Sequence, residues 1–483
     1  MNADQLAALA PIITITGAAI AVMLAIAIRR NFLLASGVAA GGILLSMLAL
    51  GLAWPQSPAQ VTLLMLLDDY ALFTMALLLV TGLAVLGFCY DYFKDREGEN
   101  EELILLLLTA LLGATVLVAS SHFAAFFLGL ETLSISLFAL AGYPINRARP
   151  LEAAIKYLIL SGVSSAFLLM GMALIYAQSG ELGFSGIGHF IANQPVMNTV
   201  VLGGVILIVA GLGFKLSLVP FHLWTPDVYE GAPAPITAFI ATVSKGAVFI
   251  LLLRFFISTD SYGYNPLLSV FSVIAMLSIL GGNVLALLQT NVKRMLAYSS
   301  IAHMGYLLVA FIAGGSIAPG LVIEAVTFYI VAYFITTTGA FGVVSVLSTP
   351  QTEAGDIGFY RGLFWRRPLL AGTFTLMLLS LAGIPVTAGF IGKFYIFTSG
   401  ADGRLWGLLA AVIAGSGLGL YYYIKIVVVM SMNEEATVRK AEESSGARIS
   451  SATLAVLSLL LIWFGLFPDH LVSIIQSVSN TVR

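Results

Sequence analysis

Long apolar stretches, separated by short polar connections, run along nearly all of the 483 residues of this chain. A helix needs about 20 apolar residues to cross the hydrocarbon core of a bilayer, and on that rule the pattern predicts about fourteen membrane-spanning helices. The expected fold is an all-α membrane protein without a separate soluble domain. The expected helix centres are Ile20, Ser46, Leu79, Leu111, Ser134, Ser165, Ile206, Thr242, Ile274, Leu308, Ala332, Leu379, Ala414 and Leu459.

Two of these stretches contain residues that break a helix. The seventh runs through Lys215 into a segment with Pro220 and Pro226, and the twelfth is interrupted at Pro385 shortly before Lys393. Proline removes a backbone donor, and irregular backbone inside a membrane is tolerated only where protein or a water-filled cavity surrounds it. Helices 7 and 12 are therefore predicted to be discontinuous and to border a polar path across the membrane.

The two interrupted helices each carry one lysine, at corresponding places in two successive groups of five helices. Transporters often contain such inverted repeats. The expected division is 1–100 as an N-terminal three-helix segment, 101–258 and 259–432 as two inverted five-helix repeats, and 433–483 as a cytoplasmic loop with a C-terminal helix.

Composition and charge narrow the class further. Hydrophobic residues make up 59% of the chain and charged residues only 10%, whereas a soluble protein has about 25% charged residues. The single cysteine, Cys89, cannot form an internal disulfide or hold an iron–sulfur cluster. The sequence has no dinucleotide or phosphate-binding glycine motif and no basic face for nucleic acid. We therefore expect no redox or nucleotide site in this chain.

The positive charges predict the orientation. Asp4 precedes the first apolar stretch and Arg29 follows it, which is typical of a retained helix and not of a cleaved signal peptide. Lys and Arg gather in alternate loops, which predicts that these loops are cytoplasmic and that both termini lie on the opposite, periplasmic side. These cations are Arg29, Arg30, Lys94, Arg96, Arg147, Arg149, Lys293, Arg294, Arg361, Arg366, Arg367, Arg439, Lys440 and Arg448.

Four ionisable residues lie deep in predicted helices. Lys245 is near the centre of 236–256, where an unpaired lysine costs roughly 2.5–3.5 kcal/mol on insertion scales. Lys215 lies at the break in the seventh helix. Glu131 needs a cation, and we expect it to pair with Lys215. Lysine can exchange protons inside a protein whereas arginine stays charged, so Lys215, Lys245 and Lys393 are candidates for a proton relay. The alternatives are tolerated polar packing for Lys245, a structural ion pair for Glu131 and snorkelling for Lys393.

Weaker candidates surround this set. Lys156 lies near the start of its helix, where snorkelling to the interface competes with a role in the relay. His222 and His303 can exchange protons near neutral pH, but each is equally expected as a packing histidine. Arg254 and Lys425 are expected to be snorkelling anchors.

Four segments resemble the antiporter-like membrane subunits of respiratory complex I. They are GLGFKLSLVPFHLWTPDVYEGAPAPITAF from residue 211, NVKRMLAYSSIAHMGYLL from 291, RGLFWRRP from 361 and SLAGIPVTAGFIGKFYIF from 380. The resemblance covers nearly the whole chain. The lysine at position 393 favours one branch of that family over another that carries glutamate there. A small departure is Ala234, where many relatives carry threonine.

The resemblance implies a proton route through Glu131, Lys215, Lys245 and Lys393, with Lys156 and His303 as further links. It implies that FMN, the iron–sulfur clusters and the quinone site belong to partner subunits, that this chain holds no cofactor or metal, and that its neighbours are other membrane-arm subunits in the lipid bilayer of the bacterial inner membrane. The alternative functions are a subunit of a multi-subunit cation/proton antiporter or a structural subunit that does not pump. A solute carrier is less favoured, because the sequence shows no substrate-sized polar pocket.

Overall fold

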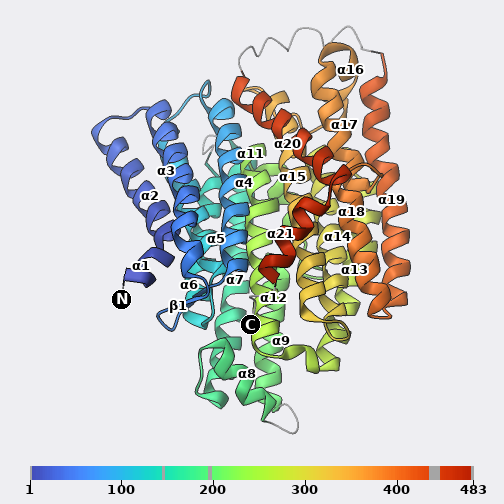
Figure 1. Ribbon diagram of the computed structural model, residues 1–483. Helices are drawn as coiled ribbons and strands as arrows, with labels where there is room; N and C mark the ends of the chain where they lie inside the picture. Colours follow the sequence, from blue (N-terminus) through green and yellow to red (C-terminus); the bar gives the residue numbers. More distant parts are fainter. Residues whose placement is uncertain (1–2, 144–146, 194–197, 434–446, 480–483) are drawn as a thin grey trace.

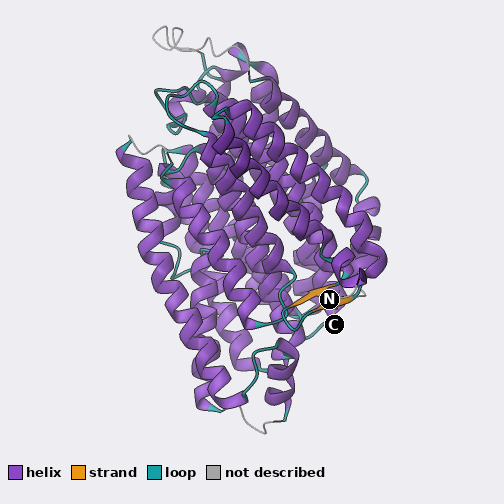
Figure 2. Ribbon diagram, turned by 90° about the vertical axis from the view of Figure 1, so that its left-hand side faces the viewer, coloured by secondary structure: helices purple, strands orange, loops and turns teal. Residues whose placement is uncertain are grey.

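The computed structural model describes residues 3–143, 147–193, 198–433 and 447–479, and within these ranges the chain is a bundle of long helices (Figure 1). The only strands in the described ranges are β1 (Ala59–Val61) and β2 (Met65–Leu67), which form one short antiparallel pair (Figure 2). Every helix centre expected from the sequence lies within a helix, and the all-α membrane fold is confirmed.

Twelve helices of the described ranges are long and apolar enough to cross a membrane. They are α2 (Ala10–Ile28), α3 (Phe32–Ala53) with the 3-10 turn η1 (Trp54–Gln56), α4 (Asp69–Phe93), α5 (Glu101–Val118), α6 (Phe123–Ala141), α7 (Ala148–Ser179), α11 (Ala234–Phe239) with η2 (Ile240–Ser244) and α12 (Lys245–Ser258), α13 (Asn265–Leu287), α14 (Val292–Ala313), α15 (Pro319–Leu347), α19 (Trp406–Ser431) and α20 (Arg448–Leu466).

Shorter elements connect these helices or lie at the ends of the described chain. They are α1 (Ala3–Ala8), α8 (Phe184–Ala192), α9 (Thr199–Lys215), α10 (Trp224–Gly231), η3 (Ser261–Gly263), η4 (Ile357–Tyr360), α16 (Leu363–Arg366), α17 (Pro368–Ala382), α18 (Ala388–Asp402) and α21 (Asp469–Ser479).

Both predicted breaks are present. Helix α9 ends at Lys215 and is followed by turns, with Ser217 at a φ of 61°, before α10 begins. Helix α17 ends at Ala382, Gly383 and Val386 take positive φ values of 84° and 75°, and α18 then begins. The left-handed backbone that ends α17 suits glycine, which has no Cβ to clash. The internal division of the bundle into two inverted repeats stays a prediction.

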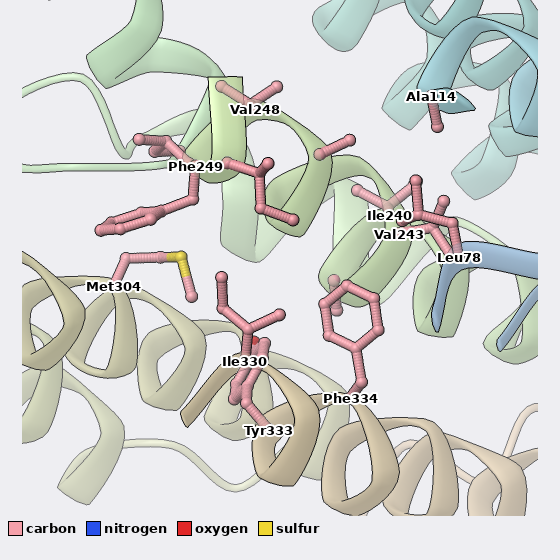
Figure 3. Close-up of a cluster of buried hydrophobic side chains, with 14 of the residues drawn as sticks. Leu78, Ala114, Ile240, Val243, Val248, Phe249, Met304, Ile330, Tyr333 and Phe334 are labelled. Atoms are coloured by element: carbon pink, nitrogen blue, oxygen red, sulfur yellow. The ribbon is translucent and has the colours of Figure 1, made fainter. Parts of the chain in front are cut away.

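The central helices are buried from end to end. In the most apolar stretch of each helix, 100% of the residues of α11–η2–α12 are buried, whereas 22% are buried in α20 and 33% in α2. Phe334 of α15 packs so closely on α12 that a Cβ added at Gly246 would lie 2.2 Å from its ring (Figure 3). The centre of the bundle is therefore protein on all sides, and it is here that the polar residues of the candidate site lie.

Different connections lie at the two ends of the bundle. In Figure 1 the α2–α3 connection with Arg29 and the short helix α16 lie at the upper end, whereas α8 lies at the lower end with α1 and the end of α21 turned towards it. The assignment of the loops to the two sides of the membrane stays a prediction. Arg439, Lys440 and most of the predicted cytoplasmic loop after 433 lie outside the described residues.

Candidate functional site

Lys215, at the end of α9, is held by serines from two neighbouring helices. Its buried ammonium donates to Ser134 of α6 at 2.8 Å and to Ser161 of α7 at 2.6 Å. One turn along α7, Ser165 donates to the carboxylate of Glu131 at 2.5 Å. In the part of the chain that the structure describes, no direct ion pair joins Glu131 to Lys215. The charge of Glu131 acts on Lys215 and serine hydroxyls make the direct contacts of both groups, so the pairing of Glu131 with Lys215 stays a prediction.

Lys245 lies in the most buried part of the bundle. It is the first residue of α12 and follows the π-helical turn η2, a feature frequent at functional sites. Its ammonium donates to Ser300 of α14 at 2.8 Å and lies 5.3 Å from the centre of the Tyr229 ring. Ser300 is also 2.7 Å from the hydroxyl of Tyr333 on α15. A hydroxyl and an aromatic face, rather than a carboxylate, surround this amine.

His303 continues the polar row one turn further along α14. Its Nδ1 is 2.6 Å from the hydroxyl of Tyr329, and its Nε2 is 3.4 Å from that of Tyr423 on α19. The Tyr423 hydroxyl also contacts Ser299. His303 interacts electrostatically with both Lys245 and Lys393. The ring thus has a hydroxyl beside each nitrogen and interacts with the charges of two lysines.

Lys393 lies on α18 beside the second break. Its ammonium donates to the carbonyl of Ala382 at 2.8 Å and is 5.2 Å from the centre of the Tyr306 ring. That carbonyl ends α17 and has no helical partner, so the break itself creates the acceptor. A cavity of about 10 Å³, about the size of one water molecule, lies between the break and α14. It is lined by His303, Tyr329, Ala332, Tyr333, Thr336, Ser380, Leu381 and Gly389.

Residues 120–419 match the family described as NADH:quinone oxidoreductase/Mrp antiporter, TM. The chain belongs to this family. It is 49% identical over 482 residues to NADH-quinone oxidoreductase subunit N of Methylococcus capsulatus, covering 99% of this chain and 96% of the relative. It is 45% identical over 486 residues to the subunit of the same name from Ectopseudomonas mendocina, covering 99% and 97%.

A solved structure also aligns with nearly the whole of this chain. A chain of respiratory complex I from Thermus thermophilus with bound aureothin aligns with a TM-score of 0.82 at 30% identity, covering 96% of this chain and 98% of that one. The resemblance to complex I stated from the sequence is confirmed. The subunit N relatives also confirm the branch that Lys393 favoured.

Two of the weaker candidates, Lys156 and His222, lie apart from the row formed by Lys215, Lys245, His303 and Lys393. Lys156 has a side chain that is 41% exposed and pairs with Asp227 and Glu152, both within 2.8 Å. It thus lies in a surface ion network and not beside the buried lysines. His222 lies in the turns after α9, and its buried Nδ1 has no hydrogen-bond partner among the described residues. Among the described residues, no hydrogen bond or ion pair joins either residue to Lys215 or Lys245.

Two pairs of oppositely charged side chains in this family member were not predicted from the sequence. Arg254 of α12 makes a bidentate pair with Asp68, at 2.9 Å and 2.7 Å, and both side chains are at most 1% exposed. The predicted role of Arg254 as a snorkelling anchor is wrong, because the guanidinium turns inward to an acid 186 residues away. Asp68 also accepts from Ala71 as the N-cap of α4, and an acid just before an apolar run is a cap signal that could have identified it. The second pair, Lys293 with Glu353, joins α14 to the loop after α15.

Proposed function

We propose that this chain is a proton-translocating membrane subunit of a bacterial NADH:quinone oxidoreductase. Its full-length similarity to two proteins named subunit N supports this proposal more than any other observation. The amines inside the bundle supply the matching chemistry, since Lys215 and Lys245 are buried and Lys393 lies beside the second break. A purely structural subunit has no need of charged groups that cost several kcal/mol each to bury.

The proposed route begins at Glu131 and Lys215, which are held by different serines of α6 and α7. A proton leaves the Lys215 ammonium, which becomes a neutral amine, and reaches the neutral amine of Lys245 through water. From Lys245 it passes by way of Ser300 and His303 towards Lys393, and it leaves on the far side of the membrane.

The route must be interrupted during each cycle. Moving one charge against 100 mV costs about 2.3 kcal/mol, so a permanently hydrated row would let protons run back. The serine shell between Glu131 and Lys215 is a suitable place for control, because rotation of two hydroxyls changes the separation of the charges. The energy for this change comes from electron transfer in partner subunits.

The proposal extends to the surroundings of the chain. Other membrane-arm subunits of the complex are its neighbours, and FMN, the iron–sulfur clusters and the quinone are bound by partner subunits. The chain lies in the bacterial inner membrane with both termini on the periplasmic side, as the cations of the alternate loops indicate.

Replacement of Lys245 tests the proposal in the assembled complex. Lys245→Ala is expected to lower the number of protons moved per NADH oxidised at least tenfold in membrane vesicles. Lys94→Ala is the matched control, since Lys94 lies at the end of α4 and pairs with Asp91 at 2.8 Å. An unchanged number of protons per NADH in Lys245→Ala would refute the relay.

A cation/proton antiporter is the second candidate, because the matching family covers both NADH:quinone oxidoreductase and Mrp antiporter subunits. Purification of the native complex separates the two. A complex I subunit is expected to purify with flavin and iron–sulfur proteins, whereas an antiporter subunit would purify without them and exchange cations for protons without NADH.

A further inference from the structure

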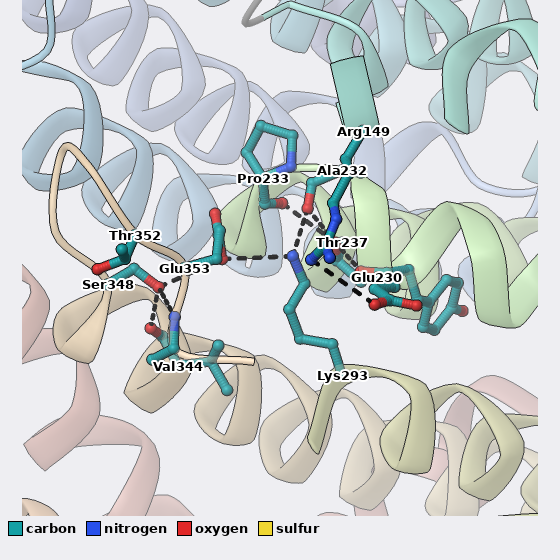
Figure 4. Close-up of polar contacts among 12 residues, drawn as sticks. Arg149, Glu230, Ala232, Pro233, Thr237, Lys293, Val344, Ser348, Thr352 and Glu353 are labelled. Atoms are coloured by element: carbon teal, nitrogen blue, oxygen red, sulfur yellow. Dashed lines mark hydrogen bonds and ion pairs between the residues drawn. The ribbon is translucent and has the colours of Figure 1, made fainter. Parts of the chain in front are cut away.

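A fourth buried amine lies outside the row described above. Lys293 is in the first turn of α14, and its side chain is only 1% exposed. Its ammonium donates to the carbonyl of Ala232 at 2.6 Å and lies 3.3 Å from the carboxylate of Glu353 (Figure 4). Sequence pattern placed this residue in a cytoplasmic loop, and neither the similarity to relatives nor the proposed route gives it a role.

Glu353 connects the amine to two further helices. One carboxylate oxygen accepts a hydrogen bond from Tyr92 at the end of α4. The other faces Lys293 and accepts from Ser348, just after α15, at 3.2 Å. Burial acts to raise the pKa of the Glu353 carboxyl, but Lys293, Tyr92 and Arg96 together hold it below its ordinary value. Glu353 is therefore a carboxylate at neutral pH, and it supplies the counter-charge for the buried ammonium.

Helix α14 is hydrogen-bonded to both ends of the segment that carries Lys245. Ala232 lies just before α11, and its carbonyl is bound by Lys293. Lys245 lies just after η2, and its ammonium is bound by Ser300. Lys293 and Ser300 are two turns apart on α14, which is about 10 Å. The 14-residue stretch from Ala232 to Lys245 is thus fixed to one helix at its start and at its end.

The segment between these two hydrogen bonds includes an irregular turn. The turn η2 (Ile240–Ser244) is π-helical, and such turns are rare and occur as single insertions within α-helices. A shift at the start of α11 would be taken up in this turn and would move Lys245 relative to Ser300. Thr237, which donates to the Pro233 carbonyl at 3.1 Å, adds a local bond at the same end.

We propose that Lys293, charge-balanced by Glu353, is a positioning residue for Lys245: it fixes the start of α11 against α14, so that the Lys245 ammonium meets the Ser300 hydroxyl. The hydrogen bond of Lys293 to the Ala232 carbonyl carries this positioning role, whereas its hydrogen bond to Glu353 balances its charge. The link to pumping rests on the proposed function, whereas the link to the conformation of 234–245 does not.

The experiment compares Lys293→Met and Lys293→Arg in the assembled complex, with Lys94→Met as the control amine at the same end of the bundle. Hydrogen exchange of peptides covering 234–245 is measured first. Lys293→Met is expected to speed exchange in this segment at least tenfold while peptides of α2 and α3 stay unchanged, and Lys293→Arg is expected to restore protection. Protons moved per NADH are expected to fall at least fivefold in Lys293→Met and to recover in Lys293→Arg.

Two results overturn the proposal. Unchanged exchange of 234–245 in Lys293→Met would show that the amine does not position the segment. Protected exchange with lost pumping in Lys293→Arg would make Lys293 a proton carrier, because arginine keeps its charge. If Lys293→Met does not assemble, Glu353→Gln provides the same test, because it removes the counter-charge of Lys293 and keeps the shape of the side chain. Unaltered hydrogen exchange of 234–245 in Glu353→Gln would reject the positioning role of Lys293. Failure of the proposed function is seen separately, as normal pumping in Lys245→Ala.

Discussion

The ammonium of Lys245 donates a hydrogen bond to the hydroxyl of Ser300, 2.8 Å away on α14, and no acidic side chain shares this contact in the described chain. A hydrogen bond to a charged group contributes about 1.5–3 kcal/mol. Ser300→Ala is therefore expected to reduce proton pumping about tenfold while leaving NADH oxidation by the uncoupled complex intact.

The control for Ser300→Ala is Ser269→Ala, because Ser269 is exposed on α13 and bonds only the carbonyl of Asn265 at 3.1 Å. Proton uptake by vesicles is measured against NADH consumed. Equal ratios in the two variants would mean that Tyr229 alone is enough to hold the Lys245 amine.

Glu131 is bound by Ser165 and lies close to Lys215 without a direct ion pair. Glu131→Gln keeps an acceptor for Ser165 but removes the charge that acts on Lys215, so pumping per NADH is expected to fall severalfold in a fully assembled complex. The amount of complex in the membrane is measured alongside. A loss of assembly with normal pumping in the remaining complex would make Glu131 structural.

The buried pair of Arg254 and Asp68 joins α12 to the start of α4. Removing one member of a buried pair costs about 3–5 kcal/mol, since the other charge is left without a partner. Arg254→Met is expected to lower the temperature of thermal inactivation of the purified complex by several degrees. The double variant Arg254→Met with Asp68→Leu is expected to recover most of this loss, because it leaves no unpaired charge; a double variant as unstable as the single one would contradict this account.

The intramembrane lysines could be predicted from the sequence because their signals are local. Lys245 is a charge in the middle of a long apolar run, and Lys215 and Lys393 each adjoin glycine or proline residues that end a helix. The cost of each charge in hydrocarbon makes such positions conspicuous. The breaks after α9 and α17 lie where the sequence placed them.

The partners of those residues could not be predicted, because they come from distant helices. Serines from α6 and α7 separate Lys215 from Glu131, and serine is too common in apolar helices to indicate such a role. Lys293 lies at the start of a helix, where the sequence pattern does not distinguish an exposed loop cation from a buried one. The π-helical turn before Lys245 has no sequence signature of its own.

Asp227 lies at the centre of a partly exposed ion network on α10. It accepts from Lys156 and from Arg294, each at 2.8 Å. Burial acts to raise the pKa of its carboxyl, but these two cations hold the pKa below the ordinary value. A carboxyl with a lowered pKa in the folded state stabilises the protein above its ordinary pKa of about 4, and this contribution is lost as the pH falls through the lowered value.

Thermal inactivation of the complex is therefore expected to be independent of Asp227 ionisation at pH 6–8 and to become easier as the pH falls below about 4. Asp227→Asn is expected to lower stability at neutral pH and to flatten this part of the acid dependence, because the variant has no carboxyl to protonate. Asp4→Asn, on the exposed helix α1, is the control. An Asp227→Asn variant with the same acid dependence as the parent would show that the network on α10 contributes nothing to stability.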